Sequence, residues 1–143
     1  MFLIDTDCLV ILQNRVQPEV QAIRQRMSSY DAGDFFVPIV SFHEITTGWN
    51  AYLNRARTSR DAVRAYQKLQ AVLQDFSRVE VAPFDDGAAQ QFDALKQQRV
   101  RIGTLDLRIA AIALARDLAL ISRNLVDFER VPGLRVEDWT RTP

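Results

Sequence analysis

Residues 104–122 read TLDLRIAAIALARDLALIS and carry the clearest structural signal in the chain. Residues 104–117 predict a strongly apolar helix. Residues 118–122 form an apolar run of the length of a short strand. A buried helix followed directly by a buried strand predicts a parallel sheet covered by helices.

The rest of the chain repeats this alternation of short apolar runs and amphipathic stretches. Strands are predicted at 1–5, 35–40, 78–84, 118–122 and 134–139, and helices at 6–15, 18–29, 41–53, 58–76, 85–99 and 104–117. In the longest predicted helix the apolar residues that recur at helical spacing are Val63, Tyr66, Leu69, Leu73 and Phe76. We therefore expect an α/β fold with a short, mostly parallel sheet of about four or five strands flanked by helices, in a single domain over residues 1–143.

The composition is that of an ordinary globular protein. In 143 residues, 18 Lys and Arg balance 18 Asp and Glu, so the net charge is zero. This balance argues against a protein that coats nucleic acid non-specifically, although a local basic patch stays open. Cys8 is the only cysteine and His43 the only histidine, which excludes a zinc cluster of these residues. Because we find neither a basic leader nor an uncharged apolar run of about 20 residues, we expect a cytoplasmic protein without a membrane span.

Acidic residues follow the predicted strands at several points. Asp5 comes at the end of the first strand, Glu44 follows the second, and Asp127 follows the fourth. Asp106 lies in the first turn of the last predicted helix. Each acid alone has an ordinary explanation, as a helix cap, as part of a capping box with Ser41, as a charge favoured by the helix dipole, or as a solvated loop residue.

The predicted topology favours a shared function for these acids. In an alternating parallel sheet, the C-termini of the strands and the N-termini of the helices share one edge, where ligands bind. Four carboxylates gathered there would repel one another and raise one another's pKa, and a divalent cation would relieve that repulsion. Oxygen ligands suit Mg²⁺ or Mn²⁺, and such an ion would activate a water for hydrolysis of a phosphodiester.

Three segments of the chain resemble one known family. They are FLIDTDCLV at 2–10, VSFHEITTG at 40–48 and IGTLDLRIAAIALARDLALISRNLVDFERVPGLRVEDW at 102–139. Together they are similar to PIN-domain ribonucleases, specifically the VapC-type toxins of bacterial toxin–antitoxin pairs. The resemblance implies a three-layer α/β sandwich and Mg²⁺-dependent endoribonuclease activity. It also implies a homodimer, and a VapB-type antitoxin that covers the active site and through which alone the toxin contacts DNA.

The same resemblance assigns roles to individual residues. The implied catalytic residues are four acids, Asp5, Glu44, Asp106 and Asp127. The implied metal ligands among them are Asp5 and Asp106. The implied supporting residues carry hydroxyl or amide groups and are Thr6, Ser122 and Asn124.

The chain departs from the family pattern at three positions. Asp7 stands where asparagine is common, Ser122 where threonine is common, and Thr104 where proline often occurs. Ser122 keeps a hydroxyl group and with it the same role. Asp7 adds a charge that could assist the metal or only cap the following helix.

Arginines offer candidate contacts to RNA phosphates. Arg108 and Arg123 flank the predicted acidic edge and are alternative phosphate contacts. The arginine run at 55–64 could also hold RNA or an antitoxin, although such a run is usually a solvated face.

Two other functions stay open. The strand followed by Asp5 and Asp7 also fits a haloacid dehalogenase-like phosphatase, but the only lysines, Lys68 and Lys96, lie in no motif at the end of a strand. The alternative without catalysis is a PIN fold retained as an interaction module. The presence of all the expected acids argues against that loss of activity.

Overall fold

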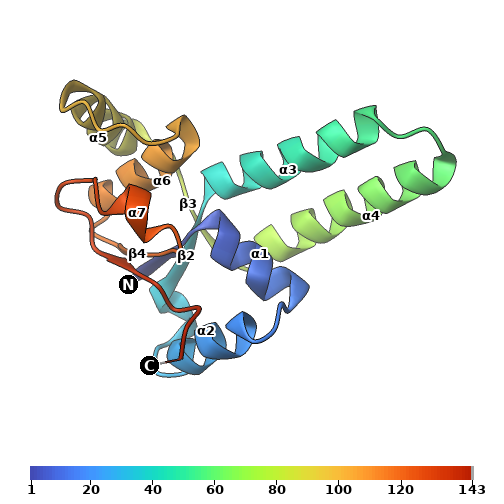
Figure 1. Cartoon of the computed structure of the whole chain (residues 1–143), viewed down its shortest axis with the longest axis horizontal. Coiled ribbons are helices and arrows are strands. Elements are labelled where there is room, and N and C mark those ends of the chain that lie inside the picture. Colours follow the sequence, from blue (N-terminus) through green and yellow to red (C-terminus); the bar gives the residue numbers. More distant parts are fainter. Residues whose placement is uncertain (143) are drawn as a thin grey trace.

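The computed structural model describes residues 1–142, which form one five-stranded sheet with helices around it (Figure 1). In chain order the elements are β1 (Phe2–Ile4), α1 (Thr6–Asn14), α2 (Glu19–Met27), the short 3-10 helix η1 (Ala32–Asp34), β2 (Phe35–Pro38), α3 (Ile39–Asn54), α4 (Ser59–Phe76), β3 (Glu80–Ala82), α5 (Asp86–Gln97), α6 (Thr104–Ala115), β4 (Ala119–Ile121), α7 (Leu125–Phe128) and β5 (Val136–Glu137). The strand order is β3-β2-β1-β4-β5, and every neighbouring pair is parallel. The expected α/β fold with a short parallel sheet is confirmed.

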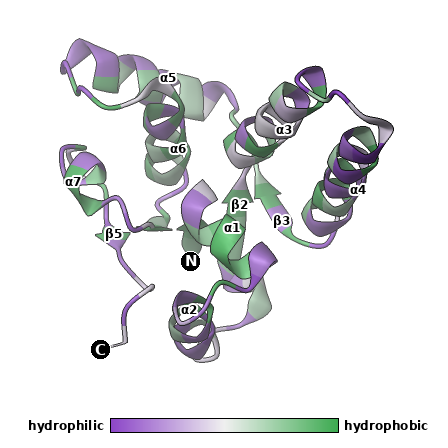
Figure 2. Cartoon of the chain, turned by 45° about the vertical axis from the view of Figure 1, so that its right-hand side comes forward, coloured by the Kyte–Doolittle hydropathy of each residue, from purple (hydrophilic) through white to green (hydrophobic). Residues whose placement is uncertain are grey.

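Alternation along the strands divides the core into two layers. In the central strand β1, Phe2 and Ile4 belong to one apolar cluster, and Leu3 belongs to the other. The first cluster joins the sheet to α1, α2 and α4 and includes Trp139, while the second joins it to α5, α6 and α7. In Figure 2 the outer helices α2 and α5 carry much hydrophilic colour, as expected for helices with one face in solvent. The sheet therefore lies between two helical layers.

Helix α6, predicted as a strongly apolar helix, is fully buried along its middle. Residues 109–113 are fully buried, and three of these five are alanines. Small side chains let α5 pack closely against α6, the pair of helices with the most extensive contact in the fold. Within residues 1–142, no helix combines the length and the apolar character that crossing a membrane requires.

Two local predictions are wrong. Helix α3 begins at Ile39, directly after Pro38, so Ser41 lies inside the helix and forms no capping box with Glu44. The extended backbone of Pro38 ends β2, and the helix starts immediately after it. Asp127, which was expected in a loop, lies on the short helix α7.

Helices α3 and α4 form a long hairpin that extends away from the sheet (Figure 1). The predicted helix over residues 58–76 is present, but most of its apolar stripe does not face the core: Leu69 is partly exposed, and Phe76 is the one residue of the stripe that is buried. Val63, Tyr66 and Leu73 are exposed, whereas Val72 and Phe76 are buried. The helical spacing of apolar residues therefore predicted the helix and not its orientation.

Candidate active site

Asp5 stands at the carboxyl end of the central strand β1. Its backbone N–H donates to the carbonyl of Ile121 at 3.0 Å, which continues the pairing of β1 with β4. One carboxylate oxygen accepts from the Thr6 N–H at 2.8 Å, and the other accepts from the Ser122 hydroxyl at 2.7 Å. Asp5 is therefore the N-cap of α1, one of the ordinary roles that the sequence allowed. It is also held by Ser122, which directly follows strand β4.

Burial makes Asp5 an unusual acid. Its side chain is 5% exposed, and burial is the main cause that raises its pKa from 3.8 to about 6. The hydrogen bonds from Ser122 and Thr6 lower the pKa, while the nearby charges of Asp106 and Asp7 raise it. The carboxylate thus carries a charge at neutral pH that its protein surroundings do not fully compensate.

Asp106, in the first turn of α6, resembles Asp5 in that burial and acidic neighbours both raise its pKa. Its pKa is raised by partial burial and then by the negative charges of Glu44, Asp127 and Asp7. The acids at the ends of β1 and β4 and at the starts of α3 and α6 therefore lie close enough to act on one another, and the exposed Asp7 lies among them.

Thr6 connects the first acidic segment to the second. Its hydroxyl donates to Glu44 Oε1 at 2.9 Å and forms a second hydrogen bond, 2.8 Å long, with the hydroxyl of Ser41. Ser41 is fully buried. The sequence did not show that Ser41 supports Thr6, because Ser41 and Glu44 match a capping box. Only the start of the helix directly after Pro38 shows that they do not form one.

Asn124 connects the fourth acid to the first. Its side-chain amide donates to Asp127 Oδ2 at 2.9 Å, and its backbone N–H donates to the Ser122 hydroxyl at 3.0 Å. Because Ser122 in turn donates to Asp5, a chain of hydrogen bonds runs from α7 to β1. Asp127 also lies 4.0 Å from the guanidinium of Arg130.

The two candidate RNA-binding arginines have different surroundings. The Arg123 guanidinium lies 3.9 Å from the Asp7 carboxylate, at the border of the acidic group. The Arg108 guanidinium lies 5.7 Å from the centre of the Phe92 ring and lines a shallow pocket with His43. The arginines at 55–64 belong to the tip of the hairpin and the first turns of α4.

The chemistry of the site fits a hard divalent cation held by few protein ligands. Within the described residues 1–142, no three side chains of the His, Cys, Asp and Glu types converge tightly enough for a complete protein cage. Mg²⁺ does not require one, since it takes one or two carboxylates and keeps several waters. Asp5 and Asp106 offer two such carboxylates, and the pKa of each is raised first by burial and then by negative neighbours, whose repulsion a cation would relieve.

Comparisons with known proteins agree on one family. The PIN domain family pattern matches residues 2–134. The tRNA(fMet)-specific endonuclease VapC of Salmonella typhimurium is 31% identical over 96% of the chain and 97% of that relative. The protein of the same description from Shigella flexneri is 27% identical over 97% of the chain and 98% of the relative. Among solved structures, the crystal structure of DNA-bound VapBC from Salmonella typhimurium superposes with a TM-score of 0.72 and 28% identity, over 96% of this chain and 97% of that one.

Proposed function

The chain belongs to the PIN-domain family, as a VapC toxin of the VapBC toxin–antitoxin type, and from that premise we propose that it is a Mg²⁺-dependent endoribonuclease. The observation that carries the proposal is that hydrogen bonds hold Asp5, Glu44 and Asp127 at one end of the sheet, where the charges of Glu44, Asp127 and Asp7 act on Asp106. Such a concentration of charge destabilises the fold unless it serves a ligand. We assign catalytic roles to Asp5, Glu44, Asp106 and Asp127.

Asp5 and Asp106 are the proposed metal ligands, with Mn²⁺ as a possible substitute for Mg²⁺. When bound, the cation would offset the charge of the scissile phosphate and lower the pKa of a water molecule. The protein itself positions the ligands. Ser122 donates to Asp5 and fixes the rotation of its carboxylate, and Asn124 holds Asp127 from the adjacent turn.

Glu44 is the proposed acceptor of the proton from the attacking water. The Thr6 hydroxyl donates a hydrogen bond to Glu44 Oε1 at 2.9 Å, and this bond fixes the orientation of the Glu44 carboxylate. The other oxygen, Oε2, is then available for the proton. Thr6 is in turn fixed by the buried hydroxyl of Ser41, so helices α1 and α3 position the Glu44 carboxylate together.

The proposed partners follow from the relatives. The Salmonella structure is a VapBC complex bound to DNA, and we propose that this chain likewise pairs with a VapB-type antitoxin and reaches DNA only through it. The Salmonella relative carries the description of a tRNA-specific endonuclease, and we propose RNA as the substrate class here. We further propose a cytoplasmic homodimer in which residues 1–143 form a single domain.

Cleavage assays with matched variants test this proposal. Asp5→Asn and Asp106→Asn should each reduce Mg²⁺- or Mn²⁺-dependent RNA cleavage at least about a hundredfold, because each removes a ligand charge. Asp93→Asn, at an exposed position on α5, serves as the control and should cleave as the unmodified protein does. Cleavage that persists in both active-site variants would reject the assignment. Hydrolysis of small phosphomonoesters with RNA left intact would instead favour a phosphatase.

A further inference from the structure

A basic pocket of about 800 Å³ is lined by α5, α6, the loop between them and α7. We call it the α5–α6 pocket. Its charged lining residues are three cations, Lys96, Arg99 and Arg101, and one acid, Asp127. Because Asp127 belongs to the acidic group of the candidate active site, the pocket reaches that site. A surplus of positive charge at this place suits a ligand that carries several negative charges.

The three cations come from one short segment of the sequence. Residues 96–103 read KQQRVRIG and contain no acid, although Lys and Arg together are balanced by Asp and Glu, 18 against 18, in the whole chain. Val100 and Ile102 pack against the apolar cluster of α5, α6 and α7, whereas Arg99 and Arg101 are exposed. The apolar residues of the loop therefore fix it to the core, and the alternating arginines stay at the surface.

Other contacts hold the loop and Lys96 in place. Arg130, which follows α7, donates to the carbonyl of Arg101 at 3.1 Å, and its guanidinium lies 4.0 Å from the Asp127 carboxylate. The Lys96 ammonium lies 5.4 Å from the ring centre of Phe92, one turn earlier on α5. The loop backbone and this ammonium are thus positioned before a ligand binds, which reduces the entropy cost of binding.

No acid neutralises these three cations. Within residues 1–142, none of Lys96, Arg99 and Arg101 forms an ion pair. Arg116 and Arg135, by contrast, lie 3.3 and 3.1 Å from aspartate carboxylates. The N–H groups of the three pocket cations are therefore available to a ligand, and phosphate oxygens are the acceptors that lysine and arginine commonly bind in nucleic acids.

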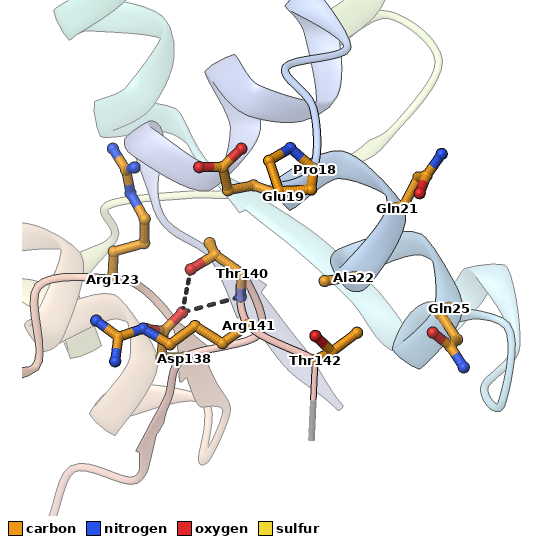
Figure 3. A pocket seen from close by; sticks show the side chains of 10 residues that line it. All are labelled: Pro18, Glu19, Gln21, Ala22, Gln25, Arg123, Asp138, Thr140, Arg141 and Thr142. Carbon is orange, nitrogen blue, oxygen red and sulfur yellow. Dashed lines mark hydrogen bonds and ion pairs between the residues drawn. The ribbon is translucent and has the colours of Figure 1, made fainter.

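A second pocket beside the acidic group has balanced charges. It measures about 530 Å³ and lies between α2 and the segment that follows β5 (Figure 3). Its charged lining residues are two arginines and two acids, Arg123, Arg141, Glu19 and Asp138. Arg141 lies 3.7 Å from Asp138, and Arg123 lies 3.9 Å from Asp7. This second pocket therefore has no surplus of positive charge that could hold a chain of phosphates.

An acidic catalytic group needs a nearby source of attraction for RNA. RNA is a polyanion, and the acids of the candidate active site repel it. Since the chain has zero net charge, it exerts little general attraction on nucleic acid. A cationic pocket that borders Asp127 supplies this attraction beside the acids. An acidic protein segment would gain nothing from lying close to those acids, so the location favours RNA as the ligand.

We propose that Lys96, Arg99 and Arg101 bind RNA phosphates next to the scissile phosphate and so hold the strand at the acidic group. This inference rests on the proposed ribonuclease function and adds positioning residues to it. None of the three is among the arginines that the sequence suggested as RNA contacts. Because they contact the backbone, they act equally on every base sequence.

Binding is measured in Mg²⁺ with a labelled single-stranded RNA of random sequence and the inactive Asp5→Asn protein. Lys96→Gln, Arg99→Gln and Arg101→Gln, combined in one chain, should weaken binding at least about tenfold near 0.1 M salt. The slope of log K against log salt should become shallower by about 2, since each phosphate contact on a single strand contributes about 0.7. Oligoadenylate and oligouridylate should lose affinity by the same factor, as expected for backbone contacts.

A matched triple variant controls for net charge. Lys68→Gln, Arg24→Gln and Arg78→Gln also remove one lysine and two arginines, all exposed and all outside the α5–α6 pocket. This control should bind RNA within about twofold of the parent, with the same salt slope. Equal losses in the control and in the pocket variant would mean that only the total charge matters, which would overturn the inference.

A charge-preserving variant separates charge from structure. Lys96→Arg with Arg99→Lys and Arg101→Lys should bind RNA within about threefold of the parent, because a phosphate accepts hydrogen bonds from either side chain. The glutamine variant of the pocket should keep the Tm of the parent, so that its loss of affinity reports the missing charges and not unfolding. An unchanged salt slope in the glutamine variant would overturn the inference.

Cleavage is measured in chains that keep Asp5. The glutamine variant of the pocket should raise KM and leave kcat nearly unchanged, because these contacts are made equally in the ground state and the transition state. Pocket-dependent RNA binding without any cleavage by the unmodified protein would support the inference and reject the ribonuclease function. If the glutamine variant binds RNA normally and loses affinity for the antitoxin, the pocket docks protein and the inference is wrong.

Discussion

The carboxyl end of the sheet and the α3–α4 hairpin are built in opposite ways. At the sheet end, hydrogen bonds join residues far apart in the chain: Thr6 and Glu44 are separated by 38 positions, and Asp5 and Ser122 by 117. The hairpin consists of two consecutive helices that pack mainly on each other, and only its base reaches the sheet. The sheet end concentrates buried charge, whereas the hairpin depends on a few apolar contacts. The two regions should therefore respond differently to substitution.

The largest effect on stability is expected at the base of the hairpin. Phe76 is buried and packs edge to face against Phe42, with ring centres 5.3 Å apart. Phe76→Ala should lower the free energy of unfolding by about 3–5 kcal/mol, because it leaves a cavity where α4 meets the core. Leu73→Ala, three residues earlier and 64% exposed, should change it by less than about 0.5 kcal/mol. Urea denaturation measures both, and equal losses would mean that the exposed face of α4 is covered in solution.

At the sheet end, Asp5→Asn is expected to raise the free energy of unfolding at pH 7, by less than Phe76→Ala lowers it. Because the pKa of Asp5 rises from 3.8 to about 6 on folding, the folded state binds this proton more tightly than the unfolded state does. The free energy of unfolding should therefore fall as pH rises from about 4 to about 6, by up to about 3 kcal/mol from this group. Asp5→Asn should remove that fall and make the metal-free protein more stable at pH 7.

Denaturation in EDTA at a series of pH values checks this expectation. The difference between the unmodified protein and Asp5→Asn should be small near pH 4 and should grow towards pH 6. If Asp5→Asn instead destabilises the protein equally at every pH, the carboxylate is an ordinary structural residue.

The two buried serines of the site, Ser122 and Ser41, should contribute different amounts to the free energy of unfolding. Ser122 donates to the charged carboxylate of Asp5, and a hydrogen bond to a charged group contributes about 1.5–3 kcal/mol. Ser41 bonds to the neutral hydroxyl of Thr6, for which about 1 kcal/mol is typical. Ser122→Ala should therefore cost more stability than Ser41→Ala when both are measured by urea denaturation at pH 7. The reverse order would show that Asp5 is held mainly by its bond to the Thr6 N–H.

The smallest effect on stability is expected at Asp85, an acid outside the candidate active site. Asp85 caps α5 by accepting from the Ala88 N–H, and this bond, together with the nearby Arg116, lowers its pKa despite some desolvation. A lowered pKa means that the contribution to stability is present above the unfolded value and is lost as pH falls through the folded value. Asp85→Ala should thus lower Tm slightly at pH 7, with a difference that shrinks below about pH 4. A Tm difference that grows as the solution is acidified would contradict this sign.

Much of the fold follows from local patterns. The apolar sequence of α6 predicted a strongly apolar helix, and the alternation of strands and helices predicted a parallel sheet. Since Asp5, Glu44 and Asp127 each follow a strand, the topology also predicted that they would share one edge. The pattern could not show their hydrogen-bond partners, because Ser41 and Glu44 match a capping box equally well.

The sequence by itself determined most of the helices and strands, although not the start of α3 or the short helix α7, because backbone conformation depends mostly on residues within about four positions of one another. Only the tertiary structure decided which side of α4 is buried, that Thr6 rather than a helix terminus engages Glu44, and that the loop between α5 and α6 lines a pocket that reaches Asp127. These outcomes depend on which surfaces meet after the chain has folded. A side chain's exposure and its hydrogen-bond partners are set by neighbours that can be more than a hundred positions away, as Ser122 is from Asp5.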